Sequence, residues 1–324
     1  MFSVLLVLLL MSGLMAQDAV KQISPRPLKS SHEVALPVPS FGSYGDPQCD
    51  ENLAMYHHLW TDKYGRTVLL RFSQSGDEST LYKLPEEFAE STSFVDFSVT
   101  PRGDVEALVI DQEFHPIIFG FDSEGHVSSH ARLETPEHVT AQHINVFPNG
   151  TVFFFGYYRS DAPAALAGKG YVGLFQTSGK LLKRLDRLRE KTKLDPPEPG
   201  RPAESATTIG RDGNVYLLTA TKVLVISPSG KLQREIAFTK PSPEFSAITV
   251  QYSDGWLAIS LAKSGKPEVL VQYLVVNALD GSPLGLYEPT EETGNNNVCF
   301  SRHDGFLFMR FENGRAKLIT APLR

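Results

Sequence analysis

From about residue 47 onward, short runs of β-branched and aromatic residues alternate apolar and polar positions, and turns that contain glycine separate these runs. Side chains along a strand point alternately to opposite faces, so a period of two residues predicts β-strands. Clear examples are residues 146–157 and 248–261. The pattern therefore predicts an all-β protein.

The glycine turns recur in a regular order. Six of them each precede an alternating run, at Gly65, Gly103, Gly150, Gly213, Gly255 and Gly305. Five of the six units then contain a second turn of similar type, at Gly76, Gly125, Gly179, Gly230 and Gly281. Asn-Gly and Asp-Gly pairs, which occur at several of these turns, favour tight hairpins because the central residues need a positive φ. Two hairpin turns per unit predict up to four antiparallel strands per unit.

Hairpins of this size cannot bury both faces alone, whereas stacking the sheets radially gives each sheet a neighbour on either side. We therefore predict a six-bladed β-propeller with four-stranded antiparallel blades. The last unit, residues 298–323, has room for only three strands, so the detached alternating run from His32 to Val38 is expected to supply the fourth and close the ring. A two-sheet sandwich is the competing architecture, but six successive units are too many for one sandwich.

The N-terminus carries an apolar run that ends at Ala16 and is followed by polar residues. The run is too short to cross a bilayer and is typical of a secretory signal peptide. We expect residues 1–16 to be a signal peptide cleaved near Ala16, residues 17–46 to be a leader with the closing strand, and residues 47–324 to be the propeller domain. The mature chain is then expected to be secreted or periplasmic, without a membrane span.

Composition narrows the classes of partner. Hydrophobic residues make up 41% of the 324 residues, which is enough for a core. The formal net charge of -6 argues against an electrostatic grip on nucleic acid, which needs a clustered positive surface. We expect a monomer that binds a protein or a small molecule at one mouth of the ring.

The chain has two cysteines, Cys49 and Cys299, near the start and the end of the repetitive region. If the ring closes, its first and last units are neighbours, and in an oxidising compartment the two thiols can pair. Two separate buried thiols are the alternative, and the sequence leaves both open. Neither cysteine has a second cysteine or a close histidine at metal-ligand spacing, so no metal site is predicted.

Histidines and acidic residues are the other candidates for chemistry. Five histidines lie in one stretch of the second and third units, and two more lie in the first unit: His115, His126, His130, His138, His143, His57 and His58. We interpret them as surface or structural histidines, because convergent further ligands cannot be placed. The acidic residues of the second unit, which include Asp96, Asp104, Asp111, Asp122 and Glu124, are interpreted as a solvated face.

One unit carries a family resemblance. Its phrases Gly210-Arg-Asp-Gly-Asn-Val-Tyr and Val225-Ile-Ser-Pro-Ser-Gly-Lys-Leu resemble blades of the NHL-repeat and gluconolactonase-like six-bladed propellers. In lactonase-like members the resemblance implies a divalent cation on the axis, held by Glu, Asn and Asp from different blades. The family's Asp-Gly pair is replaced here by Ser205-Ala206, and the chain has no Glu-Gly-Pro near its first unit and no Asn-Asp-Gly in its middle. We therefore transfer no catalytic residue, and no cofactor is predicted.

The sequence favours a binding or scaffold module over an enzyme. The usual motifs of serine hydrolases, phosphate-binding loops and zinc peptidases are all missing. The alternative is a metal-dependent lactonase-like hydrolase or a lyase that uses the axis of the propeller, with calcium or another divalent cation.

Overall fold

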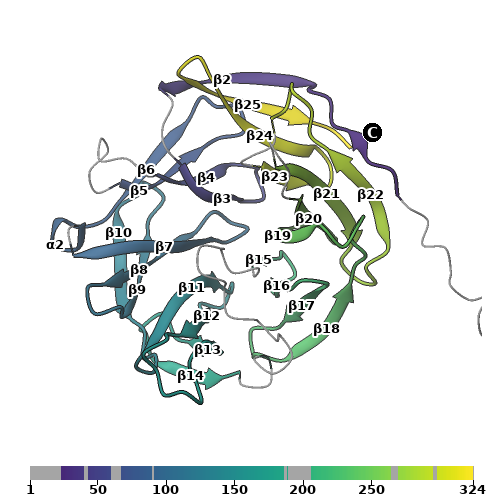
Figure 1. Ribbon diagram of the computed structural model, residues 1–324. Coiled ribbons are helices and arrows are strands. Elements are labelled where there is room, and N and C mark those ends of the chain that lie inside the picture. The colour runs from purple at the N-terminus through teal and green to yellow at the C-terminus, as the bar shows by residue number, and fades with distance from the viewer. Residues whose placement is uncertain are drawn as a thin grey trace, which may run out of the picture.

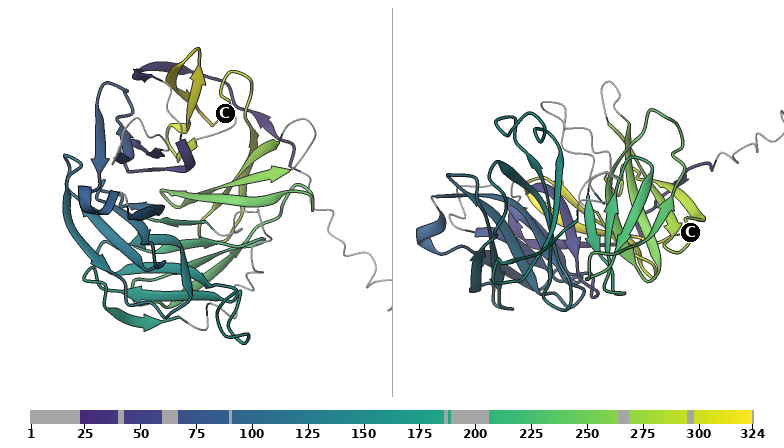
Figure 2. Two further views of the ribbon diagram at one scale, coloured as in Figure 1. Left: turned by 60° about the vertical axis from the view of Figure 1, so that its left-hand side comes forward. Right: turned by 90° about the horizontal axis from the view of Figure 1, so that it is seen from below.

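The computed structural model describes residues 23–39, 43–59, 67–89, 91–185, 188, 206–263, 269–294 and 298–323. Six antiparallel sheets surround a common axis as the blades of a propeller (Figure 1). Two further views show the blades standing side by side around the ring (Figure 2). The predicted fold class, an all-β six-bladed propeller, is confirmed. The predicted signal peptide, residues 1–16, lies outside the described residues.

The first four blades follow the order of the chain, and in each blade the first strand lies nearest the axis. Blade 1 consists of β3 (Ser43–Cys49), β4 (Met55–Leu59), β5 (Thr67–Phe72) and β6 (Ser79–Lys83). A short helix, α2 (Glu86–Ala89), leads into blade 2, which consists of β7 (Thr92–Val99), β8 (Val105–Asp111), β9 (Pro116–Phe121) and β10 (Val127–Arg132). Blade 3 consists of β11 (Val139–Val146), β12 (Val152–Tyr158), β13 (Gly170–Phe175) and β14 (Leu181–Arg184). Blade 4 consists of β15 (Thr207–Ile209), β16 (Val215–Leu218), β17 (Lys222–Ile226) and β18 (Leu232–Ala237).

The last blade is built from both ends of the chain. Its inner strands are β23 (Val298–Ser301), β24 (Gly305–Glu312) and β25 (Arg315–Ala321), and its outer strand is β2 (His32–Pro39). Strand β2 pairs antiparallel with β25, with His32 opposite Thr320. The predicted closure of the ring by the N-terminal segment is therefore confirmed.

Blade 5 departs from the expected four strands. It consists of β19 (Ser246–Ser253), β20 (Trp256–Lys263), β21 (Leu270–Asn277) and β22 (Pro283–Glu288), and a fifth strand, β1 (Arg26–Pro27), pairs with β22 in parallel. The leader was expected to hold a single strand, so β1 is a correction. The first blade also begins earlier in the chain than predicted, because the predicted boundary at residue 47 falls inside β3.

The turn glycines adopt the backbone that the hairpins need. Every predicted turn glycine in the described part of the chain has a positive φ. At most of these turns only the glycine is left-handed, as in a hairpin whose type I turn ends in a left-handed residue. Asp254-Gly255 differs, because both residues have a positive φ, which is the two-residue hairpin that the sequence predicted more widely.

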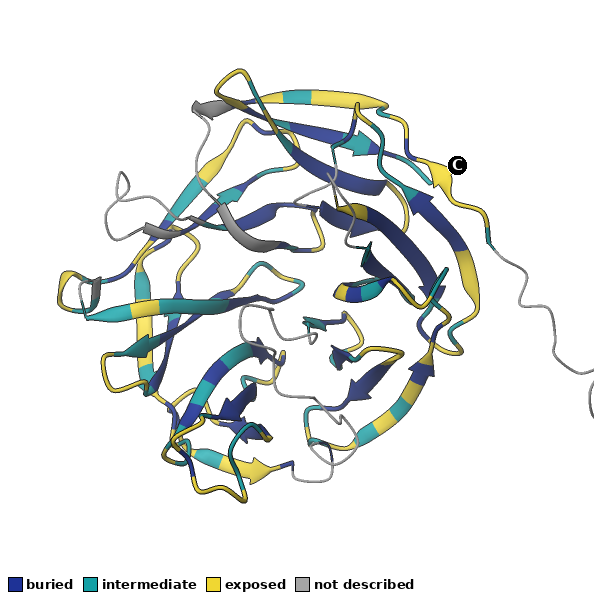
Figure 3. Cartoon of the chain, viewed as in Figure 1, coloured by how far each residue is buried: buried dark blue, intermediate teal, exposed yellow. Residues whose placement is uncertain are grey.

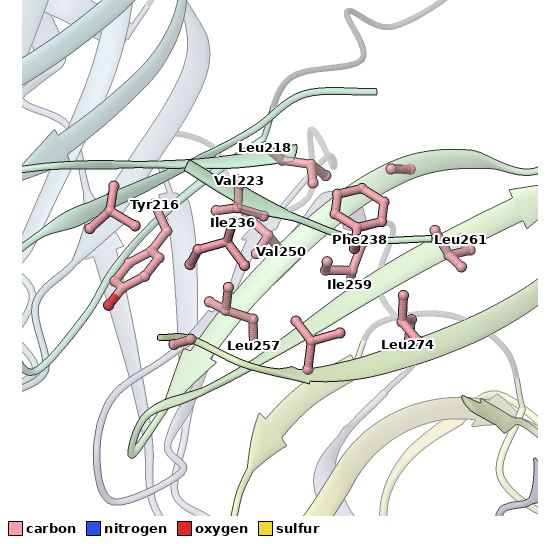
Figure 4. Close-up of a cluster of buried hydrophobic side chains, with 14 of the residues drawn as sticks. Tyr216, Leu218, Val223, Ile236, Phe238, Val250, Leu257, Ile259, Leu261 and Leu274 are labelled. Carbon is pink, nitrogen blue, oxygen red and sulfur yellow. The ribbon is translucent and has the colours of Figure 1, made fainter. Parts of the chain in front are cut away.

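The core consists of layers between neighbouring blades. The middle strands are buried on both faces, and β12, for example, has no exposed residue, whereas outer strands such as β18 alternate exposed and less exposed residues (Figure 3). Figure 4 shows one layer, in which side chains of blade 4 meet side chains of blade 5: Tyr216, Leu218, Val223, Ile236 and Phe238 against Val250, Leu257, Ile259, Leu261 and Leu274. This radial stacking removes the apolar faces from water. Among the described residues, no helix has the length and apolar character needed to span a bilayer.

Candidate functional site

A cavity of about 820 Å³ follows the axis of the propeller. Its walls come from the first strand of every blade, β3, β7, β11, β15, β19 and β23, together with the turns that follow several of them. Each of these strands contacts the corresponding strands of the two adjacent blades, so they form a closed inner ring. The cavity is thus shared by the whole molecule.

The inner strands are sheet edges, so their unpaired backbone groups need other partners. Side chains of the neighbouring blade supply several of them. Gln48 of blade 1 donates through Nε2 to the carbonyl of Phe97 in blade 2, and its Oε1 accepts from the N–H of Val99 at 2.9 Å. Ser98 of blade 2 accepts from the N–H of Val146 in blade 3 at 3.0 Å. These bonds join the blades where they face the axis.

At the seam between the first and last blades, the link is covalent. Cys49 on β3 and Cys299 on β23 form a disulfide, with their Cα atoms 6.1 Å apart and a sequence separation of 250. Between blades 4 and 5, the guanidinium of Arg211 lies 3.2 Å from Oδ1 of Asp254. Hydrogen bonds, an ion pair and a disulfide therefore link neighbouring blades at the inner ring.

One end of the cavity, where the first turns of the blades gather, is crossed by an arginine. Arg211 follows β15 in blade 4, and its Nη2 donates to the backbone carbonyl of Glu51 at 3.2 Å, while its Nε lies 3.5 Å from the Glu51 carboxylate. Glu51 belongs to blade 1, three blades away in a ring of six, so the contact spans the axis. His303 of blade 6 adds a contact of 3.4 Å to Asp254.

An aspartate and a histidine from adjacent blades meet halfway along the inner strands. Oδ2 of Asp96 on β7 lies 3.2 Å from Nδ1 of His143 on β11, and it also accepts the backbone N–H of Ile144 at 2.9 Å. Both side chains line the cavity and keep part of their surface exposed, 18% for Asp96 and 24% for His143. A carboxylate that holds one nitrogen of an imidazole orients the ring and directs the other nitrogen outward.

A second histidine lies beside this pair. His58 on β4 stacks on Phe94, with the ring centroids 3.8 Å apart, and both side chains line the cavity. Burial lowers the pKa of His58 to about 4, although the nearby charge of Asp96 acts in the opposite direction. His58 is therefore neutral at neutral pH and adds no positive charge to the cavity.

The charge of the cavity wall is unbalanced. Among the described residues, five carboxylates line it, those of Asp50, Glu51, Asp96, Asp254 and Asp304, against one guanidinium, that of Arg211. Two of the carboxylates are paired with that guanidinium. An anionic ligand would face like charge inside this low-dielectric space, which disfavours its binding.

The axial cation implied by the lactonase-like resemblance does not fit the residues in place. No group of three or more His, Cys, Asp or Glu side chains converges at metal distance in the described part of the chain. Asp50 is turned to its own hairpin, where Oδ1 accepts the N–H groups of Asn52 and Ala54 and Oδ2 accepts the hydroxyl of Tyr56. Asp96 is held by His143 and Ile144. We therefore derive no chemistry through such an ion.

The family-like motif of blade 4 has a structural role that recurs in blade 1. Oδ2 of Asp212 accepts the hydroxyl of Tyr216 at 2.8 Å, and Oδ1 accepts the N–H of Asn214 at 3.1 Å. The Asp50–Tyr56 bond of blade 1, at 3.1 Å, repeats the arrangement. The motif thus stabilises the turn at the inner end of the blade.

The histidines interpreted from the sequence as surface or structural occupy two kinds of place in the fold. His126 is exposed in the turn after β9. His130, on the outer strand β10 of blade 2, packs on Phe119 of the neighbouring strand β9. His143 and His58, in contrast, line the axial cavity. Asp96 differs from the solvated face expected of the acidic residues of the second unit, because it lines the cavity and only 18% of its side chain is exposed. Sequence reasoning missed these three because their convergence depends on how the blades are arranged in the ring.

The aromatic run of the third unit, Phe153-Phe154-Phe155, could from its sequence line a ligand mouth or pack between sheets. Phe153, Phe154 and Phe155 are all 0% exposed. Phe154 packs in the layer shared with blade 2, and its two neighbours pack in the layer shared with blade 4. Packing between sheets is confirmed.

Comparison with known proteins matches the fold without naming a function. No protein-family model matches the chain, and no curated protein matches it in sequence. A solved luciferin-regenerating enzyme is 10% identical, with a TM-score of 0.50 over 90% of this chain and 97% of that one. A putative gluconolactonase is 12% identical, with a TM-score of 0.51 over 92% of this chain and 95% of that one. Regucalcin from Agrobacterium tumefaciens, described as a calcium-binding protein, is 14% identical, with a TM-score of 0.49 over 93% and 97%.

The first two matches extend over nearly the full length of both chains, and at this identity they show the fold alone. The chain is a six-bladed propeller with the fold of the gluconolactonase-like proteins. The resemblance predicted from the blade at Gly210 is therefore confirmed at the level of the fold.

Proposed function

We propose that this protein is an exported ligand-binding module and that its ligand is a small molecule held in the axial cavity. The observation that carries the proposal is the cavity itself, about 820 Å³ in volume and lined by all six blades. Small-molecule sites usually have volumes of roughly 300–1,000 Å³ and combine apolar walls with a few placed polar groups. This cavity has that mixture, with Phe94, Phe97 and Ile209 beside Gln142, Thr208 and the Asp96–His143 pair.

The proposal favours binding over metal-dependent hydrolysis because of the donor set. The described carboxylates of the cavity are engaged by backbone N–H groups, hydroxyls or basic side chains, and they do not converge on one point. Their arrangement supports a preformed polar cavity.

A blocked cavity tests the proposed site. Thr208 on β15 lines the cavity, whereas Thr221 lies exposed in the turn between β16 and β17 of the same blade. A library of small polar molecules is screened by thermal shift, and hits are measured by calorimetry. Compounds that stabilise the wild type should lose their effect on T208W and keep it on T221W. Hits that stabilise T208W equally well would remove the axial site from consideration.

Export is tested separately. The apolar run that ends at Ala16 supports cleavage before Gln17. The full chain is expressed in a host with a secretory pathway, and the N-terminus of the product is sequenced. We expect the mature chain to begin at Gln17 and to be recovered outside the cytoplasm. A product that retains Met1 and stays in the cytoplasm would contradict export.

A further inference from the structure

The Asp96–His143 pair presents hydrogen-bond acceptors to the cavity. Both hydrogen bonds that the structure gives the Asp96 carboxylate end on Oδ2, one from Nδ1 of His143 and one from the N–H of Ile144. No described residue hydrogen-bonds to Oδ1, and a carboxylate oxygen can only accept. Oδ1 is therefore available to a donor on a ligand.

His143 offers a second acceptor. Because the carboxylate of Asp96 accepts from Nδ1, the proton of the neutral ring lies on Nδ1, and Nε2 carries a lone pair. The ring packs parallel to Phe155, with centroids 6.2 Å apart, which limits its rotation. A ligand that bonds to both Oδ1 of Asp96 and Nε2 of His143 must carry two hydrogen-bond donors, or one group with several N–H or O–H bonds.

The charge of the cavity wall favours ligands whose hydrogen-bond donors carry a positive charge. The one arginine among the described residues of the wall, Arg211, is engaged by Glu51 and Asp254, and His58 is neutral at neutral pH. No described lysine or arginine of the wall lies against Asp96, so a cationic ligand gains attraction where a neutral one gains none. Apolar wall residues such as Phe94, Val95 and Ala141 fit a carbon skeleton.

Building on the proposed axial site, we infer that its ligands are small organic cations with N–H donors, of the protonated amine class. The ammonium group donates to Oδ1 of Asp96 and Nε2 of His143, and the carbon skeleton lies against Phe94. Charge-assisted hydrogen bonds of this kind are roughly twice as strong as neutral ones, so the preference over a matched alcohol should be large enough to measure.

The test uses ligands that differ in charge and share a skeleton. Benzylamine and cyclohexylamine are compared with benzyl alcohol and cyclohexanol, and with benzoate and cyclohexanecarboxylate. Dissociation constants are measured by ligand-observed NMR on the full mature chain at neutral pH. We expect the amines to bind about tenfold more tightly than the alcohols, and the carboxylates to bind most weakly.

A matched pair of variants assigns the preference to Asp96. D96N removes the charge in the cavity, and D122N removes the charge of an exposed aspartate that also lies beside a histidine in the same blade, His126. D96N should bring the amine and the alcohol within about threefold of each other, whereas D122N should keep the tenfold preference. H143Q, which keeps the charge and removes the imidazole, provides a second variant if D96N does not fold, and it should reduce the preference about threefold.

The outcomes separate this inference from the proposed function. Alcohols or carboxylates that bind as well as the amines, in a manner blocked by T208W, would overturn the cation preference and leave the axial site intact. An amine preference that persists in D96N would overturn the role of Asp96. Failure of every amine to bind the wild type would also overturn the inference, and amine binding that T208W does not block would remove both proposals.

Discussion

Individual glycines join the blades as well as shaping their turns. The second-turn glycine of blade 3, Gly179, has a φ of +87°, and a Cβ built on it would lie 2.0 Å from the backbone carbonyl oxygen of Arg132 at the outer edge of blade 2. Gly125 and Gly281 make the same kind of approach to the blades before them. The repeated glycines therefore reflect two requirements, a left-handed backbone and a close contact between blades.

The two requirements can be separated by alanine. Gly213 has a φ of +73°, and no atom lies within 4 Å of the place that an added Cβ would take, so only its backbone conformation is at risk. We expect G213A to destabilise by about 1 kcal/mol and G179A by roughly 3 kcal/mol or more, because the latter must also move a backbone carbonyl. Urea unfolding of both variants measures the difference. Equal losses of unfolding free energy in G213A and G179A would show that the contact between blades does not contribute to stability.

A buried carboxyl group is a second residue-scale feature. Glu106 lies on β8, and its Oε2 is sealed from solvent without a hydrogen-bond partner among the described residues. Burial, with a smaller contribution from the charge of Asp104, raises the pKa of Glu106 to about 8. The folded protein thus keeps this proton at a pH where the unfolded chain, with the ordinary pKa near 4.5, has lost it. The contribution of Glu106 to the stability of the fold is therefore fully present below pH 4.5 and is lost as the pH rises toward 8.

Replacing this group with a neutral one removes that dependence. E106Q should be more stable than the wild type by about 1–3 kcal/mol at pH 8, with the gain shrinking toward pH 4.5. Thermal unfolding of both proteins between pH 4.5 and 8 measures the gain, and E124Q, at an exposed turn, serves as the control. A gain that does not depend on pH would contradict the raised pKa of Glu106.

Side chains on the axis show what sequence reasoning cannot reach. Asp96 and His143 are 47 residues apart and belong to different blades. Alternation along each strand predicts which residues share a face, but the meeting of two faces at the axis depends on the angle between sheets. The acidic composition of the second unit could be read from the sequence, whereas the one carboxylate that faces inward could not.

At the scale of strands, the alternating pattern and the turn glycines were sufficient to predict the sheets and the closing strand. The strand β1 was missed because two residues carry no periodic signal. The middle strands were recognised from β-branched and aromatic residues, although burial on both faces makes runs such as Val152–Tyr158 continuously apolar. The outer strands retain the clearer alternation.

Removal of the closing strand tests its contribution to stability. Leu36 on β2 is 4% exposed and packs with Leu318 and Leu307 of blade 6. A chain that starts at residue 40 loses this packing and exposes the edge of β25, whereas a chain that starts at residue 30 loses β1 and the buried Leu28 and keeps β2. We expect the shorter chain to melt well below the longer one and to aggregate, since an uncovered edge strand invites pairing. Unchanged melting would argue against any stabilising role for β2.

At the scale of the molecule, the ring is held at its seam in two places, by β2 on the outside and by the Cys49–Cys299 disulfide at the axis. The disulfide closes a loop of 250 residues, for which loss of chain entropy in the unfolded state gives a stabilisation of roughly 5 kcal/mol as an upper figure. The proximity of these cysteines was expected from ring closure alone.

The double variant C49S/C299S should lose about 2–5 kcal/mol of unfolding free energy in denaturant titrations. Dithiothreitol should destabilise the wild type by a similar amount and leave the double variant unaffected. The unfolded, unreduced wild type should contain no thiol that reacts with Ellman's reagent. Two reactive thiols per chain would show that the cysteines are not bridged.

Completion of blade 6 by β2 also sets an order of events during biosynthesis. The hydroxyl of Ser31, beside β2, bonds to a carbonyl 289 residues later in the chain, so this segment is made long before its partner and cannot pair until Thr320 has been synthesised. Blades 1 to 4, whose strands are all local, can form while the chain is still emerging. Strand β2 must therefore stay unpaired until β25 has been made, and the ring is expected to close only then.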